Sequence, residues 1–243
     1  MFSLYKKELQ SYMYSPLAYV LSAVFMLIFS WTFISWITSL ETSVMSFSFP
    51  EIFYNYFFYF VFIIPMLTMK SFAEERKLNT EVLLMSTPLN VFKIVMAKFI
   101  AISTVLLFMM ALTLIFPIIT MAHGAVVWSS LICGYIGFYT WGIACAAIGM
   151  LASSFTENQI IAAIIGEAAM IFLLFVDSFS QNEFLLKLPV VSGFLESISP
   201  RIRFTSFAMG VFSLSDLVFY LSFIAVVLCW TMISVEKRRW SRG

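Results

Sequence analysis

The sequence predicts an all-α integral membrane protein with six transmembrane helices in a single domain, residues 1–243. Hydrophobic residues make up 62% of the chain and charged residues only 11%, and the mean hydropathy is +0.98. A water-soluble domain of this length does not need so much apolar surface. Six apolar runs are long enough to cross a bilayer as helices, and most basic residues fall on one side of them.

Residues 1–16 precede the first apolar run and predict an amphipathic helix that lies in the membrane interface. Apolar side chains recur at helical spacing along one face, namely Phe2, Tyr5, Leu9, Tyr12 and Met13. The opposite face is polar and carries Ser3, Lys7, Gln10 and Ser11. The alternative is a frayed basic tail, and the sequence leaves both interpretations open.

The predicted membrane spans cover residues 17–40, 52–69, 94–121, 126–152, 159–176 and 217–235. Pro65 should kink the second span and Pro117 the third. Residues 177–216 are too apolar for a solvated loop and too broken for a full span. They therefore predict a re-entrant or interfacial hairpin on the outer side, before the sixth span.

Two features inside the spans predict specific roles. Small residues follow one face of the fourth span at positions i, i+4, i+7 and i+11, and they are Gly142, Ala146, Gly149 and Ser153. Such a stripe favours close helix packing. Glu167 falls midway along the fifth span, where an ionised carboxylate usually faces protein or water. It is either a polar point on a translocation path at a dimer interface or a structural acid that is protonated or hydrogen-bonded.

The segment 70–93, between the second and third spans, holds the densest charge in the chain. Residues 74–77 are all charged, so this turn should be polar on every side and lie in water. Thr80 to Met85 then predicts a short helix across the membrane surface. The chain returns to the bilayer through Lys93 and Lys98, whose long side chains can reach the interface. An ordinary basic cytoplasmic loop is the alternative.

Basic residues are distributed unequally between the two sides of this six-span arrangement. One side carries eleven, namely Lys6, Lys7, Lys70, Arg76, Lys77, Lys93, Lys98, Lys237, Arg238, Arg239 and Arg242. The other side carries three, namely Lys187, Arg201 and Arg203. Because basic loops stay in the cytoplasm, we expect both termini and the segment 70–93 to lie there. This predicts a multi-pass protein of the cytoplasmic (inner) membrane.

The segment 70–93 resembles the coupling helix of ABC-2-type transporter permease subunits, which docks on an ATPase subunit. The resemblance implies an ATPase-coupling role for Glu74, Glu75, Arg76, Lys77, Thr80, Glu81, Val82, Leu83, Leu84 and Pro88. Val82 and Leu83 would fill a groove on the ATPase, and the charged turn before them would orient the contact. The family commonly has Gly before the Thr, where this chain has Asn79. Asn tolerates a left-handed backbone, so the turn can be kept.

The C-terminal part is similar to the gliding-motility and copper-reductase-maturation branch of these permeases. The matching residues are Ser199, Pro200, Phe204, Phe207, Gly210 and Asp216. That branch often has histidine just before the first Phe, and Arg203 stands there in this chain.

The resemblance implies an exporter permease that forms its translocation path as a dimer with a second, identical or homologous, permease chain. The sequence has no G-x-x-x-x-G-K-[ST] loop, so ATP and Mg would bind to a separate P-loop ATPase dimer. We expect no cofactor, metal or catalytic residue in this chain. Membrane lipid is a further expected partner, an accessory membrane protein is compatible with the sequence, and nucleic acid is not expected. Aromatic first and second spans, with the fifth, suit amphipathic or lipid-like cargo. An intramembrane enzyme or a passive channel acting without an ATPase is the alternative.

Overall fold

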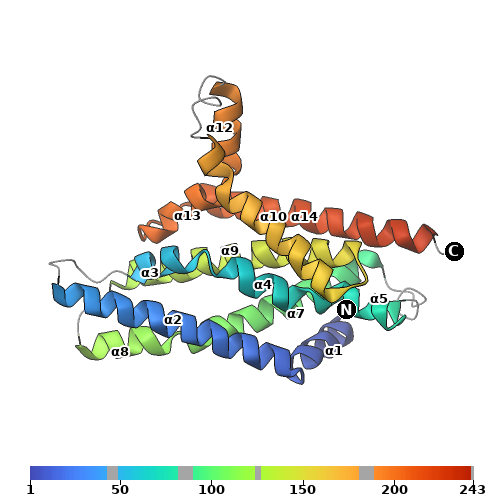
Figure 1. Cartoon of the computed structure of the whole chain (residues 1–243), viewed down its shortest axis with the longest axis horizontal. Helices are drawn as coiled ribbons and strands as arrows, with labels where there is room; N and C mark the ends of the chain where they lie inside the picture. Colours follow the sequence, from blue (N-terminus) through green and yellow to red (C-terminus); the bar gives the residue numbers. More distant parts are fainter. Residues whose placement is uncertain (43–48, 82–89, 124–126, 181–188, 242–243) are drawn as a thin grey trace.

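The computed structural model describes residues 1–42, 49–81, 90–123, 127–180 and 189–241, and this part of the chain is helical without strands (Figure 1). Its helices are α1 (Phe2–Met13), α2 (Pro16–Thr42), α3 (Phe49–Tyr56), α4 (Phe60–Thr68), α5 (Lys70–Lys77), α7 (Val91–Leu112), α8 (Ile115–His123), α9 (Trp128–Phe155), α10 (Gln159–Ser180), α12 (Pro189–Ile198), α13 (Pro200–Ala208) and α14 (Leu214–Ser241). Figure 1 shows both termini at the same end of the bundle as α1 and α5. We call this the terminal end.

Five helical stretches in the described residues are long and apolar enough to cross a membrane. They are Pro16–Thr38, Val91–Ala122, Trp128–Phe155, Gln159–Val176 and Leu214–Arg238. They correspond to the first, third, fourth, fifth and sixth predicted spans. Each stretch begins and ends within three residues of the predicted bounds. The chain is therefore a helical protein with several membrane-spanning candidates.

The predicted second span, residues 52–69, is broken into α3 and α4 by a turn at residues 57–59. Neither helix is long enough to span a bilayer alone. Both are buried, and Phe53, Tyr56 and Phe60 are inaccessible to solvent. The indole N–H of Trp141 on α9 donates to the Phe57 carbonyl at the break, at 3.4 Å. Irregular backbone of this kind is tolerated at membrane depth where protein covers it.

Prolines explain one interruption and not the other. Pro117 cannot donate to the carbonyl of Thr113, and the third span breaks there, between α7 and α8. The Thr113 hydroxyl donates to the Met110 carbonyl at 2.7 Å. Pro65, by contrast, lies inside α4, and the breaks on either side of it fall at residues 57–59 and at Met69.

Helix α9 is the centre of the bundle, and it contacts α3, α4, α5, α7, α10, α13 and α14. Its glycines let these neighbours approach. A Cβ on Gly142 would lie 2.6 Å from Leu106 on α7 and 3.2 Å from Phe60 on α4. A Cβ on Gly149 would collide with the Thr68 hydroxyl. Ala146, between them, is fully buried. Helix α4, the second half of the interrupted span, therefore packs directly on the small-residue stripe.

The N-terminal helix α1 buries most of the predicted face, with Tyr5, Leu9 and Met13 half-buried, and adds two residues that the prediction left out. Its buried residues are Leu4, Glu8 and Tyr12, which pack toward α7, whereas Phe2 is 77% exposed. Hydrophobic periodicity alone assigned Phe2 to the apolar face and left Glu8 out of it. Leu4 packs on Ile94 and Ala97 of α7, and Glu8 is buried because α7 presents Lys98 to it.

Residues 189–208 form α12 and α13, which meet at Ser199 and Pro200. Ser199 caps α13 by accepting from the Ile202 N–H, and the Tyr220 hydroxyl donates to the Pro200 carbonyl at 2.6 Å. Helix α13 packs on α9 through Phe207, which lies against Gly137. Figure 1 shows α12 projecting away from the bundle.

The Arg203 guanidinium lies 3.1 Å from the Asp216 carboxylate and joins α13 to α14. Its guanidinium carbon also lies over the Phe219 ring, 5.0 Å from the centroid. Arg203 and Asp216 were both noted in the comparison with the permease branch, but not as a pair. The structure shows that they form an ion pair.

Candidate functional site

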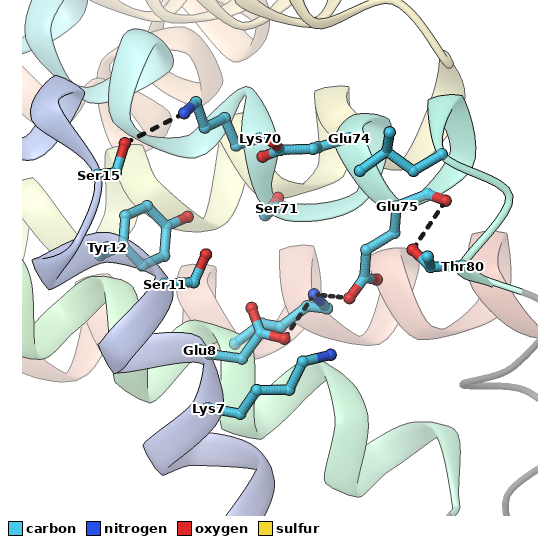
Figure 2. Close-up of a pocket in the computed structure, with 12 residues that line it drawn as sticks. Lys7, Glu8, Ser11, Tyr12, Ser15, Lys70, Ser71, Glu74, Glu75 and Thr80 are labelled. Atoms are coloured by element: carbon cyan, nitrogen blue, oxygen red, sulfur yellow. Dashed lines mark hydrogen bonds and ion pairs between the residues drawn. The ribbon is translucent and has the colours of Figure 1, made fainter.

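The densest buried charge in the described residues lies at the terminal end, where α5 meets α1, α7 and α9 (Figures 1 and 2). Helix α5 contains the whole charged turn, residues 74–77, that was predicted to lie in water. Two of its side chains instead enter buried ionic contacts. Helix α5 is thereby fixed to helices that come from three distant parts of the sequence.

The first contact is a three-residue ion cluster centred on Lys98 of α7. Its ammonium lies 3.1 Å from the Glu8 carboxylate of α1 and 2.8 Å from the Glu75 carboxylate of α5 (Figure 2). It also lies over the Phe72 ring, 5.4 Å from the centroid. Lys98 is only 1% exposed, so it does not extend to water as predicted. Buried charges of this kind are stable only with their partners in place.

The second contact is made by Arg76, which was expected in water and is only 3% exposed. Its Nε donates to the Glu81 carboxylate at 3.2 Å. Its Nη1 donates to the Ser154 carbonyl and, at 3.3 Å, to the Thr156 carbonyl at the end of α9. Burial lowers the pKa of Arg76 and Glu81 opposes the shift, so the cation is kept. A cation at a helix C-terminus is favourable for the helix dipole.

Ser153, the last member of the predicted stripe, bonds α5 to α9. Its hydroxyl oxygen accepts from the Phe72 and Ala73 N–H groups at 3.1 and 3.0 Å. It donates to the Met69 carbonyl at 2.9 Å. The Ser153 side chain thus provides hydrogen-bond partners for three backbone groups at the junction of α4 and α5. Helix packing alone was predicted for this position, and hydrogen bonding accompanies it.

The end of α5 has the turn that the sequence indicated. Asn79 has a left-handed backbone, with φ of 56°. The Thr80 N–H donates to the Glu75 carbonyl at 2.9 Å and the Asn79 N–H to the Arg76 carbonyl at 3.0 Å. This is the hydrogen-bond pattern of a helix that ends on a left-handed residue. The departure from glycine at Asn79 therefore leaves the turn intact.

The remaining coupling residues lie partly within the described part of the chain. Glu74 is half-buried, and Lys77 and Thr80 are exposed. Glu81 is buried through its contact with Arg76. The other members of the predicted set lie outside the described residues, and they are Val82, Leu83, Leu84 and Pro88.

Helix α14 also ends at this site. The Arg238 guanidinium donates to the Phe155 carbonyl at 2.7 Å, and the hydroxyls of Ser154 and Ser234 lie 3.0 Å apart. Sequence reasoning missed Glu8, Ser154 and Arg238 as members of the site. A signal existed for Glu8, since Leu4, Glu8 and Tyr12 recur at i, i+4 and i+8.

Glu167 lies on α10 and is half-buried. Three exposed isoleucines, Ile160, Ile164 and Ile171, occupy neighbouring positions on the same side of the helix. The carboxylate therefore borders an apolar face that no described part of this chain covers.

The aromatic residues of the first and second predicted spans pack against one another inside the subunit. The Phe60 and Phe138 rings stack 4.2 Å apart, Phe25 and Tyr56 lie against both, and Phe29 packs on Tyr56. These side chains form the core. The exposed apolar residues of α2 lie elsewhere, with Trp31 74% exposed.

The fold and the candidate spans define the class of the protein as a multi-pass helical membrane protein. No model of a known protein family matches the chain, and a search of the curated proteins found no match either. The resemblance to ABC-2-type permeases therefore stays a prediction.

Proposed function

We propose that this chain is the membrane-spanning permease subunit of an ATP-driven exporter, powered by a separate P-loop ATPase dimer. The observation that supports this most is the attachment of α5. Helix α5 is bonded directly to α7 and α9, through Lys98, Arg76 and Ser153, and Lys98 links it in turn to Glu8 of α1. A push on the segment that follows α5 would therefore move three helices together, which is what coupling to an ATPase requires.

In this proposal the chain crosses the membrane six times, with α3 and α4 together as the second crossing. The terminal end faces the cytoplasm, because eleven of the fourteen basic residues lie on that side of the predicted topology. Helix α1 lies in the interface, and α12 with α13 belongs to the outer side as an interfacial or re-entrant hairpin. The membrane is the cytoplasmic one.

The working unit has two permease chains. A carboxylate in lipid is expensive, so Glu167 is better placed against protein or water. A second, identical or homologous, chain on the exposed face of α10 would provide that environment. The translocation path then lies between the two chains. The exposed surfaces of the chain carry large apolar side chains, such as Trp31 of α2. A path lined by such surfaces fits amphipathic or lipid-like cargo best.

The experiment replaces Val82, Leu83 and Leu84 by alanine in the reconstituted permease–ATPase complex. Truncating one buried anchor of an interface costs on the order of 2 kcal/mol, which weakens association roughly 30-fold. We expect the ATPase to be lost from the complex, or its hydrolysis to be uncoupled from transport, with membrane insertion unchanged.

The matched control is Leu214→Ala, since Leu214 is an exposed leucine at the start of α14, at the opposite end of that helix from the C-terminus. It should change neither association nor hydrolysis. If the triple alanine variant behaves like this control, the segment after α5 is an ordinary loop and the coupling role is wrong.

A further inference from the structure

A cavity of about 220 Å³ lies between α1 and α5, with α7 beside it (Figure 2). The hydroxyls of Tyr12 and Ser71 line it and are buried, and neither has a hydrogen-bond partner among the described residues. Figure 2 shows both directed into the space between the two helices. A buried hydroxyl without a partner is costly, so two of them in one cavity indicate that something else bonds to them.

The inner lining of the cavity is acidic. Lys98 is already held between Glu8 and Glu75, so this cluster carries one positive and two negative charges. Glu74 adds a third carboxylate to the lining. Burial, together with these three carboxylates, raises the pKa of Tyr12, so its hydroxyl stays neutral and can accept a hydrogen bond. A cation that donates several hydrogen bonds fits such a lining.

Two lysines add positive charge to the lining, and Figure 2 shows them on opposite sides of the cavity. Lys7 is exposed and Lys70 is half-buried, and both belong to the cavity. The Lys70 ammonium lies 3.2 Å from the Ser15 hydroxyl, so ammonium and hydroxyl donors occur together. These groups suit an anion such as a phosphate ester. The lining thus offers an acidic interior and, at Lys70 and Ser15, a basic side.

The cavity lies at the level where helices enter the membrane. Ser15 immediately precedes the candidate span that begins at Pro16, and Lys98 lies about two turns into the span that begins at Val91. Phospholipid headgroups occupy this depth of a bilayer. A ligand with a terminal ammonium a few atoms from a phosphate, presented at this depth, is a phospholipid headgroup.

We propose that the cavity between α1 and α5 binds the phosphoethanolamine headgroup of a membrane phospholipid, with the primary ammonium at Glu74, Tyr12 and Ser71 and the phosphate at Lys70 and Ser15. A choline headgroup has no N–H and cannot donate to these acceptors. The site therefore distinguishes ethanolamine from choline lipids. This inference goes beyond the proposed transport function and does not depend on an ATPase.

The test is a titration of the purified, delipidated chain in detergent, followed by native mass spectrometry. Phosphatidylethanolamine and phosphatidylcholine with identical acyl chains are compared, with soluble phosphoethanolamine as a third arm. Since hydrogen bonds to charged groups are lost with choline, we expect about tenfold tighter binding of the ethanolamine lipid. Soluble phosphoethanolamine should bind far more weakly than the lipid, because the acyl chains add apolar burial.

Two variants assign the site. Tyr12→Phe removes only the hydroxyl, and Glu74→Gln removes only the charge. Each should reduce binding of the ethanolamine lipid about tenfold and leave the choline lipid unchanged. The control is Tyr14→Phe, since Tyr14 ends the same helix and is 84% exposed. Variants are compared only at matched thermal stability, and the isosteric Tyr12→Phe decides if Glu74→Gln does not fold.

Three results would overturn the proposal. Equal affinity for the two lipids would mean that the cavity does not recognise the ethanolamine ammonium. Wild-type affinity in both Tyr12→Phe and Glu74→Gln would place lipid binding elsewhere. Soluble phosphoethanolamine binding as tightly as the lipid would identify the occupant as a free solute. None of these results bears on whether an ATPase drives transport.

Discussion

At the scale of single residues, Lys98 is the residue whose replacement should affect the fold most, because it links three helices. It is a buried cation at the start of a membrane-spanning helix, held by two carboxylates from two other helices. Removing the cation alone would leave Glu8 and Glu75 buried with like charges and no counter-ion. Removing one partner of a buried ion pair destabilises more than replacing the whole pair.

We therefore expect Lys98→Met to lower the free energy of unfolding by about 3 kcal/mol. Adding Glu8→Gln and Glu75→Gln should recover a large part of this loss, because no charge is then left unpaired. Thermal unfolding of the purified chain in detergent measures both effects. Lys93→Met, an exposed lysine on the same helix, is the control. A Lys98→Met variant as stable as this control would refute the ion cluster.

Two neighbouring residues show what sequence could and could not predict at this scale. The left-handed backbone of Asn79 followed from its residue type. The burial of Arg76 did not, since a run of four charged residues is typical of a solvated turn. Two of its three partners are carbonyls at the end of α9, 78 and 80 residues further along the chain. Local pattern carries no information about such a contact.

At the scale of elements, α9 organises the bundle through its small residues. The Thr68 hydroxyl, which a Cβ on Gly149 would meet, is itself bonded to the Ile64 carbonyl at 3.0 Å. It cannot turn aside without losing that hydrogen bond. Helix α4 must therefore shift if Gly149 gains a side chain.

We predict that Gly149→Ala destabilises the protein by about 1–3 kcal/mol through overpacking. Gly193→Ala on α12 is the matched control, because a Cβ added at that position would have no other group within 4 Å. That change should be neutral or stabilising by up to about 1 kcal/mol, from helix propensity. The measurement is the unfolding midpoint of each variant in detergent. Equal midpoints would show that α4 does not pack on the stripe.

Elements also differ in how well the sequence predicted them. The first, third, fourth, fifth and sixth spans were predicted because long apolar runs set helix lengths. The break at residues 57–59 carries no such signal, since Phe57, Phe58 and Tyr59 continue the aromatic run. What stabilises the break is Trp141, a tertiary contact. The burial of Glu8 on α1 was missed for the same reason, since its partner is Lys98 of α7.

At the scale of the whole molecule, the proposal requires one orientation. The terminal end carries α5 and both chain ends, and the predicted topology gives it most of the basic residues. The protein should therefore insert with this end in the cytoplasm.

Single cysteines test this orientation in intact cells with a reagent that does not cross membranes. Cysteines at Asn79 and Asn158 should be shielded, and cysteines at Ser43 and Gln181 should be labelled. Membrane permeabilisation should make the first pair reactive, which shows that the sites are accessible. Labelling at Asn79 from outside would reverse the orientation and remove the coupling role of the segment after α5.

The most direct test of the central claim is the composition of the complex purified from its native membrane in mild detergent. We predict two permease chains with two copies of a P-loop ATPase, and ATP hydrolysis that disappears when the permease is purified alone. Disabling the ATPase should abolish both hydrolysis and transport. A chain that purifies without an ATPase, and that conducts solute or performs chemistry by itself in liposomes, would contradict the account.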